Sequence, residues 1–368
     1  MNLKNQDSRQ KSQILIFISV ICFLGLLLIT PLKIKANNDR DSILNLPLFN
    51  SDSLLRLELK SNLAELINDV GEKRSYHQCL LRDIKGDQTN SDWLKVNIKT
   101  RGNFRRRKQN CDFPPLRFKI PHRKSNNTVF EGQSKLKYVS HCQSEIESYE
   151  QHTIEEYLLY KMYNLVSNHS YRVRLSQISF IDTITNDTLQ KFGFFLENRE
   201  DVAKRNGKRI MNYKNVRQYN LLRKNIVMLS LFQLMIGNTD WDVSRLHNID
   251  LISVSDHSIP VAVPYDFDWT SIINQAYYTQ DQKIDPKAKY QRLYKGYRWS
   301  SGELETSLSD YKELKESFLE IVFNCPYLNE DNKQRFGGYI EEFYKLISSR
   351  KDIKKVIVKA SPKIPTVK

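Results

Sequence analysis

Five of the polar side chains between Asp240 and Asp268 are of the types that phosphoryl-transfer chemistry uses. Asp240, Asp242 and Asn248 lie in one segment, and Asp266 and Asp268 follow a later apolar run. In kinase-type sites one carboxylate orients the attacking hydroxyl, while an Asn and a second carboxylate hold magnesium. The order of these residues therefore indicates a kinase-type phosphotransferase site.

A purely structural explanation competes with this interpretation. Asp and Asn are common at turns, because their side chains cap backbone N–H groups. That explanation fits Asp266 and Asp268 less well, since they directly follow an apolar run and lie between Tyr265 and Trp269. Charges in such a setting are costly unless they are compensated. A metal ion or a basic partner would offset the cost, so the second cluster is the stronger indication.

The elements that must position these residues can be predicted from the surrounding sequence. Residues 221–236 are apolar on nearly every side, which predicts a helix that is buried all round. Gly237 and Asn238 then end it, as is common at helix C-termini. Apolar runs at 249–254 and 259–263, joined by a polar turn, predict a hairpin that brings the two acidic segments together.

The chain before residue 120 is typical of strands and turns. Residues 54–59 and 93–99 alternate between apolar and polar, and residues 116–120 alternate again after two prolines. A basic loop at 101–108 separates the last two of these strands. A strand, a basic loop with a glycine and a lysine-bearing strand are the parts with which a kinase amino-terminal lobe covers phosphates.

The candidate phosphate contacts are Arg101 and Arg105 in the basic loop and Lys119 on the strand that follows it. Lys135 and Lys137, in a third predicted strand, compete with Lys119 for the role of the kinase strand lysine. A lysine on the solvent side of an alternating strand needs no function. The choice among the three lysines therefore stays open.

Two adjacent glutamates lie in a predicted helix further along the chain. Thr153 and Glu156 match a capping box, which predicts a helix from Thr153 to about Val166. In active kinases a helix glutamate forms an ion pair with the strand lysine. Because the cap already explains Glu156, Glu155 is the better candidate for that ion pair.

Four segments together resemble the CotH family of atypical, secreted or spore-associated kinases. They read RGN at 101–103, GFFLE at 193–197, GNTDWDVSRLHN at 237–248 and PYDFDW at 264–269. The likeness is more distant to HipA-like kinases, which have a Gly-Asn-x-Asp loop and a later Tyr-Asp. The resemblance implies an α+β, two-lobed protein-kinase-like fold, with ATP and Mg as cofactors and Mn as an alternative metal. It also implies phosphoryl transfer to a hydroxyl group of a protein.

The resemblance implies roles for individual residues. Asp240 orients the acceptor hydroxyl, while Asn248 and Asp266 hold the metal with assistance from Asp268. Asp242 is the alternative to Asp240, since kinase loops place the Asn about five residues after the Asp. Inserts in this loop occur in the family, which favours Asp240.

Glu197 ends the GFFLE segment, which lies near the nucleotide in the family. The resemblance therefore implies that Glu197 contacts the site, and a carboxylate at the rim is the alternative. The chain has no glycine-rich loop beyond the single RGN segment. This departure from the kinase pattern predicts a low affinity for ATP.

Residues 1–36 predict a signal peptide or a signal anchor. A basic start is followed by an apolar stretch at 14–29, which is slightly shorter than a usual membrane span of about 20 residues. Ala36 offers only a poor cleavage site, which favours an uncut anchor in the membrane. We therefore predict a membrane-anchored or secreted protein with the bulk of the chain outside the cytoplasm.

Four cysteines outside the apolar stretch permit disulfides in an exported protein. Cys111 and Cys142 flank two predicted strands, so they are the first pair to expect. The alternative is four buried free thiols, with Cys79 and Cys325 as the other two, because cysteine is often buried anyway.

The net charge of +15 favours contact with anionic partners. The basic loop at 101–108 has the composition of a nucleic-acid patch. However, no recognised nucleic-acid motif accompanies it, and the other basic residues are spread along the chain. These observations argue against a nucleic-acid partner, although a basic polyanion-binding protein stays as a third interpretation.

The 368 residues suffice for one large or two-lobed unit with a substantial core. We predict a strand-rich lobe at 37–200, a mostly helical lobe at 201–360 with the acidic loops, and a disordered tail at 361–368. The leading function is an extracytoplasmic kinase. The rival is a non-catalytic, membrane-tethered surface or binding protein with the same fold, a pseudokinase, because ATP is scarce outside the cytoplasm. The acceptor protein and the oligomeric state stay unknown.

Overall fold

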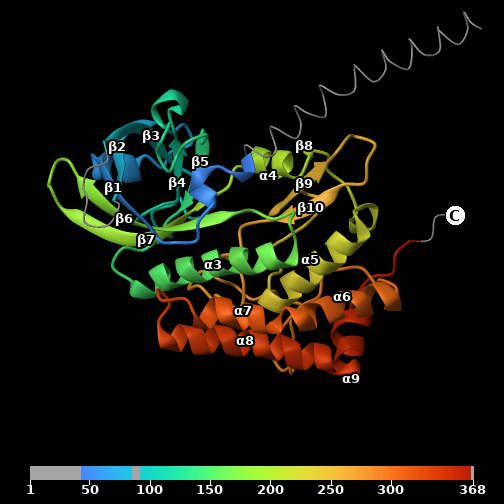
Figure 1. Cartoon of the computed structure of the whole chain (residues 1–368). Coiled ribbons are helices and arrows are strands. Elements are labelled where there is room, and N and C mark those ends of the chain that lie inside the picture. Colours follow the sequence, from blue (N-terminus) through green and yellow to red (C-terminus); the bar gives the residue numbers. More distant parts are fainter. Residues whose placement is uncertain (1–42, 85–91, 366–368) are drawn as a thin grey trace, which may run out of the picture.

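The computed structural model describes residues 43–84 and 92–365, which form a mixed α/β fold (Figure 1). A β-barrel lies on one side of the molecule, a small sheet lies beside it, and helices from the second half of the chain pack beneath both. The prediction of an α+β fold, with strands mainly first and helices mainly last, is confirmed at this level.

Seven strands close the barrel in the order β1-β2-β3-β4-β5-β7-β6. Neighbouring strands are antiparallel, except that β1 and β6 run parallel. Closure was not predicted, and it leaves the sheet without an open edge. The strands are β1 (Leu55–Ser61), β2 (His77–Asp83), β3 (Leu94–Thr100), β4 (Leu116–Lys119), β5 (Lys135–Val139), β6 (Val173–Asp182) and β7 (Thr188–Leu196).

Alternation of apolar and polar side chains explains why these strands form a barrel. On β3, Leu94, Val96 and Ile98 are buried, whereas the intervening Lys95 and Asn97 are exposed. Successive side chains of a strand point to opposite faces, so the apolar set fills the interior. Each such buried side chain contributes about 1.5–3 kcal/mol to the stability of the barrel.

The remaining elements form the helical side and the second sheet. Helix α3 lies directly beneath the barrel, and α5, α7 and α8 continue the helical layer below it (Figure 1). The second sheet has the order β10-β9-β8. The longer helices are α3 (Glu147–Val166), α5 (Arg223–Ile236), α6 (Ser301–Glu313), α7 (Lys315–Phe323) and α8 (Glu330–Ser348). The shorter elements are η1 (Pro47–Phe49), α2 (Leu63–Asn68), η2 (His122–Lys124), α4 (Arg199–Arg205), β8 (Arg209–Met211), η3 (Gln218–Asn220), β9 (Ile249–Ser253), β10 (Val261–Pro264), α9 (Arg350–Ile353) and η4 (Lys354–Val358).

Helix α5 is the buried helix that the sequence predicts. Every residue from Asn225 to Ile236 is buried, and the helix ends at Gly237. Gly237 has a φ of 67°, the left-handed conformation in which glycine commonly ends a helix.

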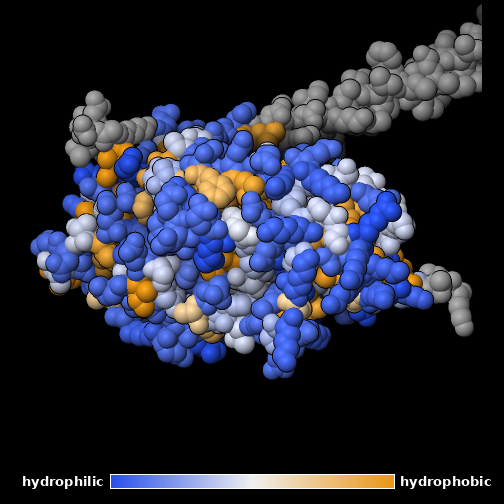
Figure 2. Space-filling model, turned by 90° about the horizontal axis from the view of Figure 1, so that it is seen from below, coloured by the Kyte–Doolittle hydropathy of each residue, from blue (hydrophilic) through white to orange (hydrophobic). Residues whose placement is uncertain are grey.

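The face seen from below in Figure 2 is mostly hydrophilic, with apolar residues in small patches. The helices therefore turn their apolar sides inward, as Phe336, Ile340 and Phe343 of α8 do.

The start of α3 differs from the prediction. The helix begins at Glu147, so Thr153 lies inside it and caps nothing. Its hydroxyl instead donates to the carbonyl oxygen of Tyr149 at 3.0 Å, one turn earlier. The predicted capping box is therefore wrong, and Glu156 is free of the structural role that the sequence assigned to it.

The carboxy-terminal elements also differ in detail from the prediction. The mostly helical lobe predicted at 201–360 contains separate helices, and Leu314 divides α6 from α7. The first residues of the tail at 361–368, which was predicted to be disordered, contact the body of the protein. Ser361 is buried and the backbone N–H of Arg298 donates to Pro362 at 2.8 Å, while residues 366–368 lie outside the described part.

The predicted disulfide between Cys111 and Cys142 is confirmed. It joins the end of the basic loop after β3 to the segment between β5 and α3. Cys79 and Cys325 are buried free thiols. The disulfide therefore connects the segment that carries Arg101 and Arg105 to the chain that leads into α3.

The predicted signal peptide or anchor at 1–36 lies outside the described residues. Within residues 43–84 and 92–365, none of the helices has the length and apolar character needed to cross a membrane.

Candidate functional site

The hairpin of β9 and β10 places the two acidic segments at one end of the second sheet. Ile249 pairs with Pro264, and the N–H of Tyr265 donates to the carbonyl oxygen of Asn248 at 3.1 Å. Asn238, just after α5, forms a bridge with Thr270. The segment before β9 and the segment after β10 therefore run beside each other.

Asn248 and Asp266 are among the residues of this region that have an unusual backbone conformation. Asn248 has a φ of 52° and Asp266 has a φ of 64°. Positive φ angles are uncommon outside glycine, and they cluster at functional sites where the surroundings enforce them. At Asp266 the backbone N–H donates to the hydroxyl of Tyr160 in α3 at 2.8 Å, which fixes the turn from the helical layer.

Asp240 and Asn248 are in direct contact. The Asn248 Nδ2 atom donates to the Asp240 carbonyl oxygen at 2.8 Å and to its Oδ2 atom at 3.0 Å. The Nε2 atom of His247 lies 2.7 Å from the other carboxylate oxygen. The carboxylate of Asp240 is thus held at both oxygens, with its side chain 41% exposed.

Asp242 has a local structural role instead. Its carboxylate accepts hydrogen bonds from the hydroxyl of Ser244 at 2.6 Å, from the backbone N–H of Arg245 at 3.1 Å and from the Arg245 Nε at 3.0 Å. Burial raises the pKa of Asp242, but these hydrogen bonds outweigh it and hold the pKa below its usual value. The structure thus places Asp242 in the turn-capping role and leaves Asp240 beside Asn248.

Arg105 joins the basic loop to two buried carboxylates. Its Nη1 atom lies 3.4 Å from Glu156 and 3.9 Å from Asp268, and its Nη2 donates to the carbonyl oxygen of Ser140 at 2.6 Å. The hydroxyl of Tyr277 donates to Asp268 at 2.8 Å. Segments that are far apart in the sequence therefore meet around one guanidinium group.

Burial controls the ionisation of this cluster. It raises the pKa of Asp268 to about 6, and the neighbouring charge of Asp266 acts in the same direction, while Arg105 opposes both. Burial also raises the pKa of Glu156, with Asp268 adding to the effect. Burial alone would lower the pKa of Arg105, but Tyr277, Asp268 and Glu156 raise it above its usual value.

Arg101 and Lys137 supply further positive charge next to Asp266. Burial lowers the pKa of Arg101, against the opposing charge of Asp266. Burial likewise lowers the pKa of Lys137 to about 8, assisted by Arg101 and opposed by Asp250 and Asp266. The Lys137 ammonium lies 5.0 Å from the ring centroid of Tyr265.

Three of the residues predicted for the site lie elsewhere. Lys119 is exposed on the outside of the barrel, opposite Lys135 of β5. Glu155 is fully buried and forms an ion pair with Arg335 of α8. Burial raises the pKa of Glu155 to about 8, although Arg335 opposes the shift. Neither residue contacts Asp266 or Asp268.

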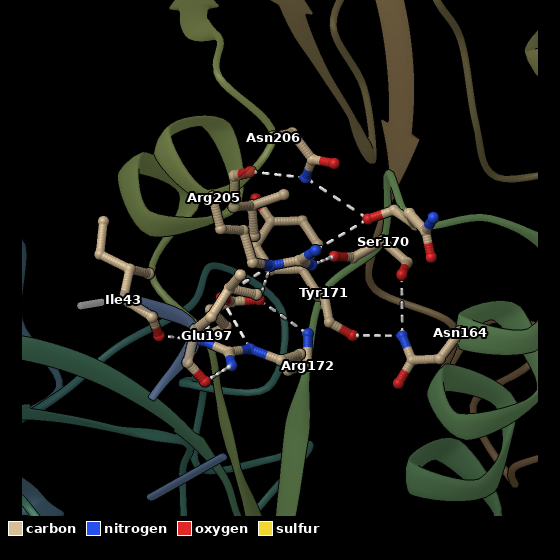
Figure 3. A network of polar contacts seen from close by, with 11 residues as sticks. Ile43, Asn164, Ser170, Tyr171, Arg172, Glu197, Arg205 and Asn206 are labelled. Atoms are coloured by element: carbon tan, nitrogen blue, oxygen red, sulfur yellow. Dashed lines mark hydrogen bonds and ion pairs between the residues drawn. The ribbon is translucent and has the colours of Figure 1, made fainter. Parts of the chain in front are cut away.

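Glu197 is the third of these residues, and it lies in a separate ion-pair network (Figure 3). Its carboxylate accepts from Arg172 Nε at 3.0 Å and from Arg205 Nε at 3.0 Å. It also accepts from the backbone N–H of Arg172 at 2.9 Å. With its side chain fully buried, Glu197 holds the start of β6 to α4 and is not positioned to contact a nucleotide.

The structure adds residues that the sequence did not single out. Lys295 donates from Nζ to the carbonyl oxygens of Thr239 at 2.6 Å and Trp241 at 2.8 Å, the two residues that flank Asp240. Tyr160 and Tyr277 hold Asp266 and Asp268. Lys295 comes from a loop rich in Tyr, Lys and Gln that shows no motif, so the sequence carries no signal for this contact.

The donor set fits a magnesium ion that is also held by phosphates. Among the described residues, no group of three or more His, Cys, Asp and Glu side chains is close enough to hold a metal. Magnesium, however, is usually bound by one or two carboxylates together with substrate phosphates and waters. The exposed carboxylate of Asp266 and the Oδ1 atom of Asn248 accept no hydrogen bond within the described residues, so both oxygens are available.

No family model and no curated protein matches this sequence. Among solved structures, the Helicobacter pylori proinflammatory kinase CtkA is similar at 10% identity and a TM-score of 0.38, over 63% of this chain and 90% of that chain. The Golgi casein kinase is similar at 10% identity and a TM-score of 0.32, over 89% of this chain and 79% of that chain. At TM-scores this low neither similarity establishes a shared fold, and the CotH resemblance stays a prediction.

Proposed function

We propose that this chain is a kinase-like phosphotransferase that moves a phosphoryl group from Mg–ATP to a hydroxyl group of a protein. The supporting observation is the convergence of separate segments on one place. The loop after β3 gives Arg101 and Arg105, β5 gives Lys137, and α3 gives Glu156. The loops that flank the β9–β10 hairpin give the acidic residues.

Each of these groups has a role in the proposed reaction. Asp240 orients the acceptor hydroxyl and accepts its proton, as the catalytic-loop Asp of kinases does. Asn248 and Asp266 would hold a magnesium ion, which neutralises charge on the phosphates when it is bound. Arg101 and Lys137, whose charges interact with that of Asp266, would contact the same phosphates.

The site departs from the kinase pattern at the helix glutamate. Glu156 pairs with Arg105 of the basic loop and not with a strand lysine. Arg105 thus replaces the lysine as the cation that connects α3 to the acidic cluster. This substitution also favours the second candidate function, a non-catalytic binding protein of the same fold, because the chain itself already neutralises part of its acidic cluster.

The proposal places the reaction outside the cytoplasm, with the membrane as the second partner through residues 14–29. The Cys111–Cys142 disulfide supports this location, since disulfides persist mainly in oxidising compartments. The acceptor is a protein whose identity the site does not define.

Transfer of label from γ-labelled ATP tests the proposal. The full chain, with and without magnesium, is incubated with itself and with a mixture of exported proteins as acceptors. We expect magnesium-dependent label on hydroxyl side chains. Binding of Mg–ATP without any transfer would favour the non-catalytic candidate, and absence of both would overturn the proposal.

Lys137→Met is expected to raise the Kd for Mg–ATP about tenfold, because a charge-assisted contact to phosphate is lost. Affinity of the wild type should also fall as the pH rises through about 8, where Lys137 loses its proton. Calorimetric titrations one pH unit below and above that value measure both effects. Lys119→Met, on the exposed outer surface of β4, is the control and should bind like the wild type. Equal weakening by both variants would contradict the assignment.

Lys295→Met is expected to lower kcat about 10- to 100-fold with little change in the KM for ATP. The reason is that the backbone on both sides of Asp240 loses its tether, and small displacements of a catalytic group cost this much in rate. Lys295→Arg should restore part of the rate. A rise in KM with unchanged kcat would show that Lys295 does not act through Asp240.

A further inference from the structure

A pocket of about 440 Å³ lies outside the phosphotransfer site. It is formed where the segment after η1, the end of α3, the start of β6 and the end of α4 come together. None of the residues that we assign to the phosphotransfer site lines it. Its polar lining includes Lys161, Arg172, Arg205 and Asp52.

Positive charge exceeds negative charge in this pocket. Two guanidinium groups, of Arg172 and Arg205, share the single carboxylate of Glu197 (Figure 3). Lys161 pairs with Asp52 at 2.7 Å, but the side chain of Asp52 is 70% exposed. An exposed carboxylate is screened by water and compensates little. The buried Arg205 and the partly buried Arg172 therefore keep an excess positive charge.

The positive charges of this region also act on His169. Burial lowers its pKa to about 4, and the charges of Lys208 and Arg205 contribute in the same direction. Only the contribution of Lys208 and Arg205 reflects a positive potential, because burial disfavours a charge of either sign.

The lining also offers hydrogen-bond donors. A guanidinium group has five N–H groups, and those of Arg205 donate to Glu197, Asn168 and Ser170. Three of the five are thereby used, which leaves two without a partner among the described residues. Asn50 and Asn168 also line the pocket. Planar guanidinium groups match the oxygens of a phosphate in geometry and in charge.

We propose that this pocket is a second binding site, for a phosphate group, with Lys161, Arg172 and Arg205 as its cationic ligands. The group could be supplied by free inorganic phosphate or by a small phosphate monoester, since both present the same oxygens. The proposal does not depend on the phosphotransferase activity.

Calorimetric titration of the full chain tests it, with sodium phosphate and glycerol 3-phosphate as separate probes at constant ionic strength. We expect saturable binding of at least one probe, and tighter binding of the monoester if its organic part also fits the pocket. Lys161→Met should raise the Kd about tenfold, because one charged hydrogen bond is lost. Lys161 is partly exposed and lies at the helix surface, so this variant should fold.

Two control variants distinguish phosphate binding in this pocket from binding at other basic residues. Lys204→Met, an exposed lysine of α4 outside the pocket, should bind both probes like the wild type. Lys137→Met should also keep phosphate binding, because Lys137 belongs to the phosphotransfer site. Absence of saturable binding in the wild type would overturn the proposal. Equal loss in the Lys161 and Lys204 variants, or loss only in the Lys137 variant, would overturn it as well.

Discussion

Asp240→Asn is expected to lower the rate of phosphoryl transfer by about two to four orders of magnitude, the usual contribution of a positioned general base. Its affinity for Mg–ATP should stay near that of the wild type, because the side chain contacts Asn248 and His247 and is assigned to the acceptor. Loss of kcat without loss of binding is the signature of a group that acts mainly in the transition state. Single-turnover rates and calorimetric titrations of the same preparation measure the two quantities.

Asp242→Asn is the matched control for that prediction. Its carboxylate is engaged with Ser244 and Arg245 in its own turn, so we expect measurable turnover to persist. The opposite pattern, with turnover lost in Asp242→Asn and kept in Asp240→Asn, would move the role to Asp242. If neither substitution changes any detectable transfer, the catalytic interpretation should be given up for that of a binding protein.

Glu197→Gln is expected to destabilise the fold by about 3–5 kcal/mol, the cost of removing one partner from a buried ion pair. Without the carboxylate, the buried Arg205 and the partly buried Arg172 would both lose their anionic partner. The effect should appear in the free energy of unfolding in urea at neutral pH, where the wild-type carboxylate is charged.

Glu316→Gln, in an exposed pair with Lys315, is the control and should change stability little. The family resemblance implied that Glu197 contacts the nucleotide. If Glu197→Gln left the stability unchanged and weakened ATP binding instead, that implication would be correct and the structural role would be wrong.

Long apolar runs and period-two alternation made much of the framework predictable. Helix α5 is apolar on all sides and is followed by Gly237, so both its burial and its end could be read from the sequence. The β9–β10 hairpin followed from two short apolar runs around a polar turn. Closure of the barrel could not be predicted, because the pairing of β5 with β7 and of β1 with β6 joins segments that are far apart in the chain.

Within the candidate site, the sequence alone did not show which of two neighbouring residues faces the acidic cluster. Glu155 was preferred over Glu156 because Thr153 looked like a helix start. The helix begins at Glu147 without a side-chain cap, and therefore without a local signal. Glu156, and not Glu155, faces Arg105 and Asp268.

Partners from distant segments explain the other differences. Lys119 and Lys137 both lie on alternating strands, and only the closed barrel shows that Lys137 reaches Tyr265 and the charge of Asp266. Glu197 finds Arg172 on β6 and Arg205 on α4, and neither pairing follows a local pattern. In each case the three-dimensional pairing, and not the residue type, decides the role.

Magnesium-dependent binding of ATP to the full chain tests most directly whether Asp266 and Asn248 form a magnesium–nucleotide site. Calorimetric titration with and without magnesium should show saturable binding that requires the metal. Asp266→Asn should abolish that dependence, whereas Asp256→Asn, in the exposed turn at the other end of the same hairpin, should leave it intact. Absence of ATP binding in the wild type, or unchanged magnesium-dependent affinity in Asp266→Asn, would contradict the account.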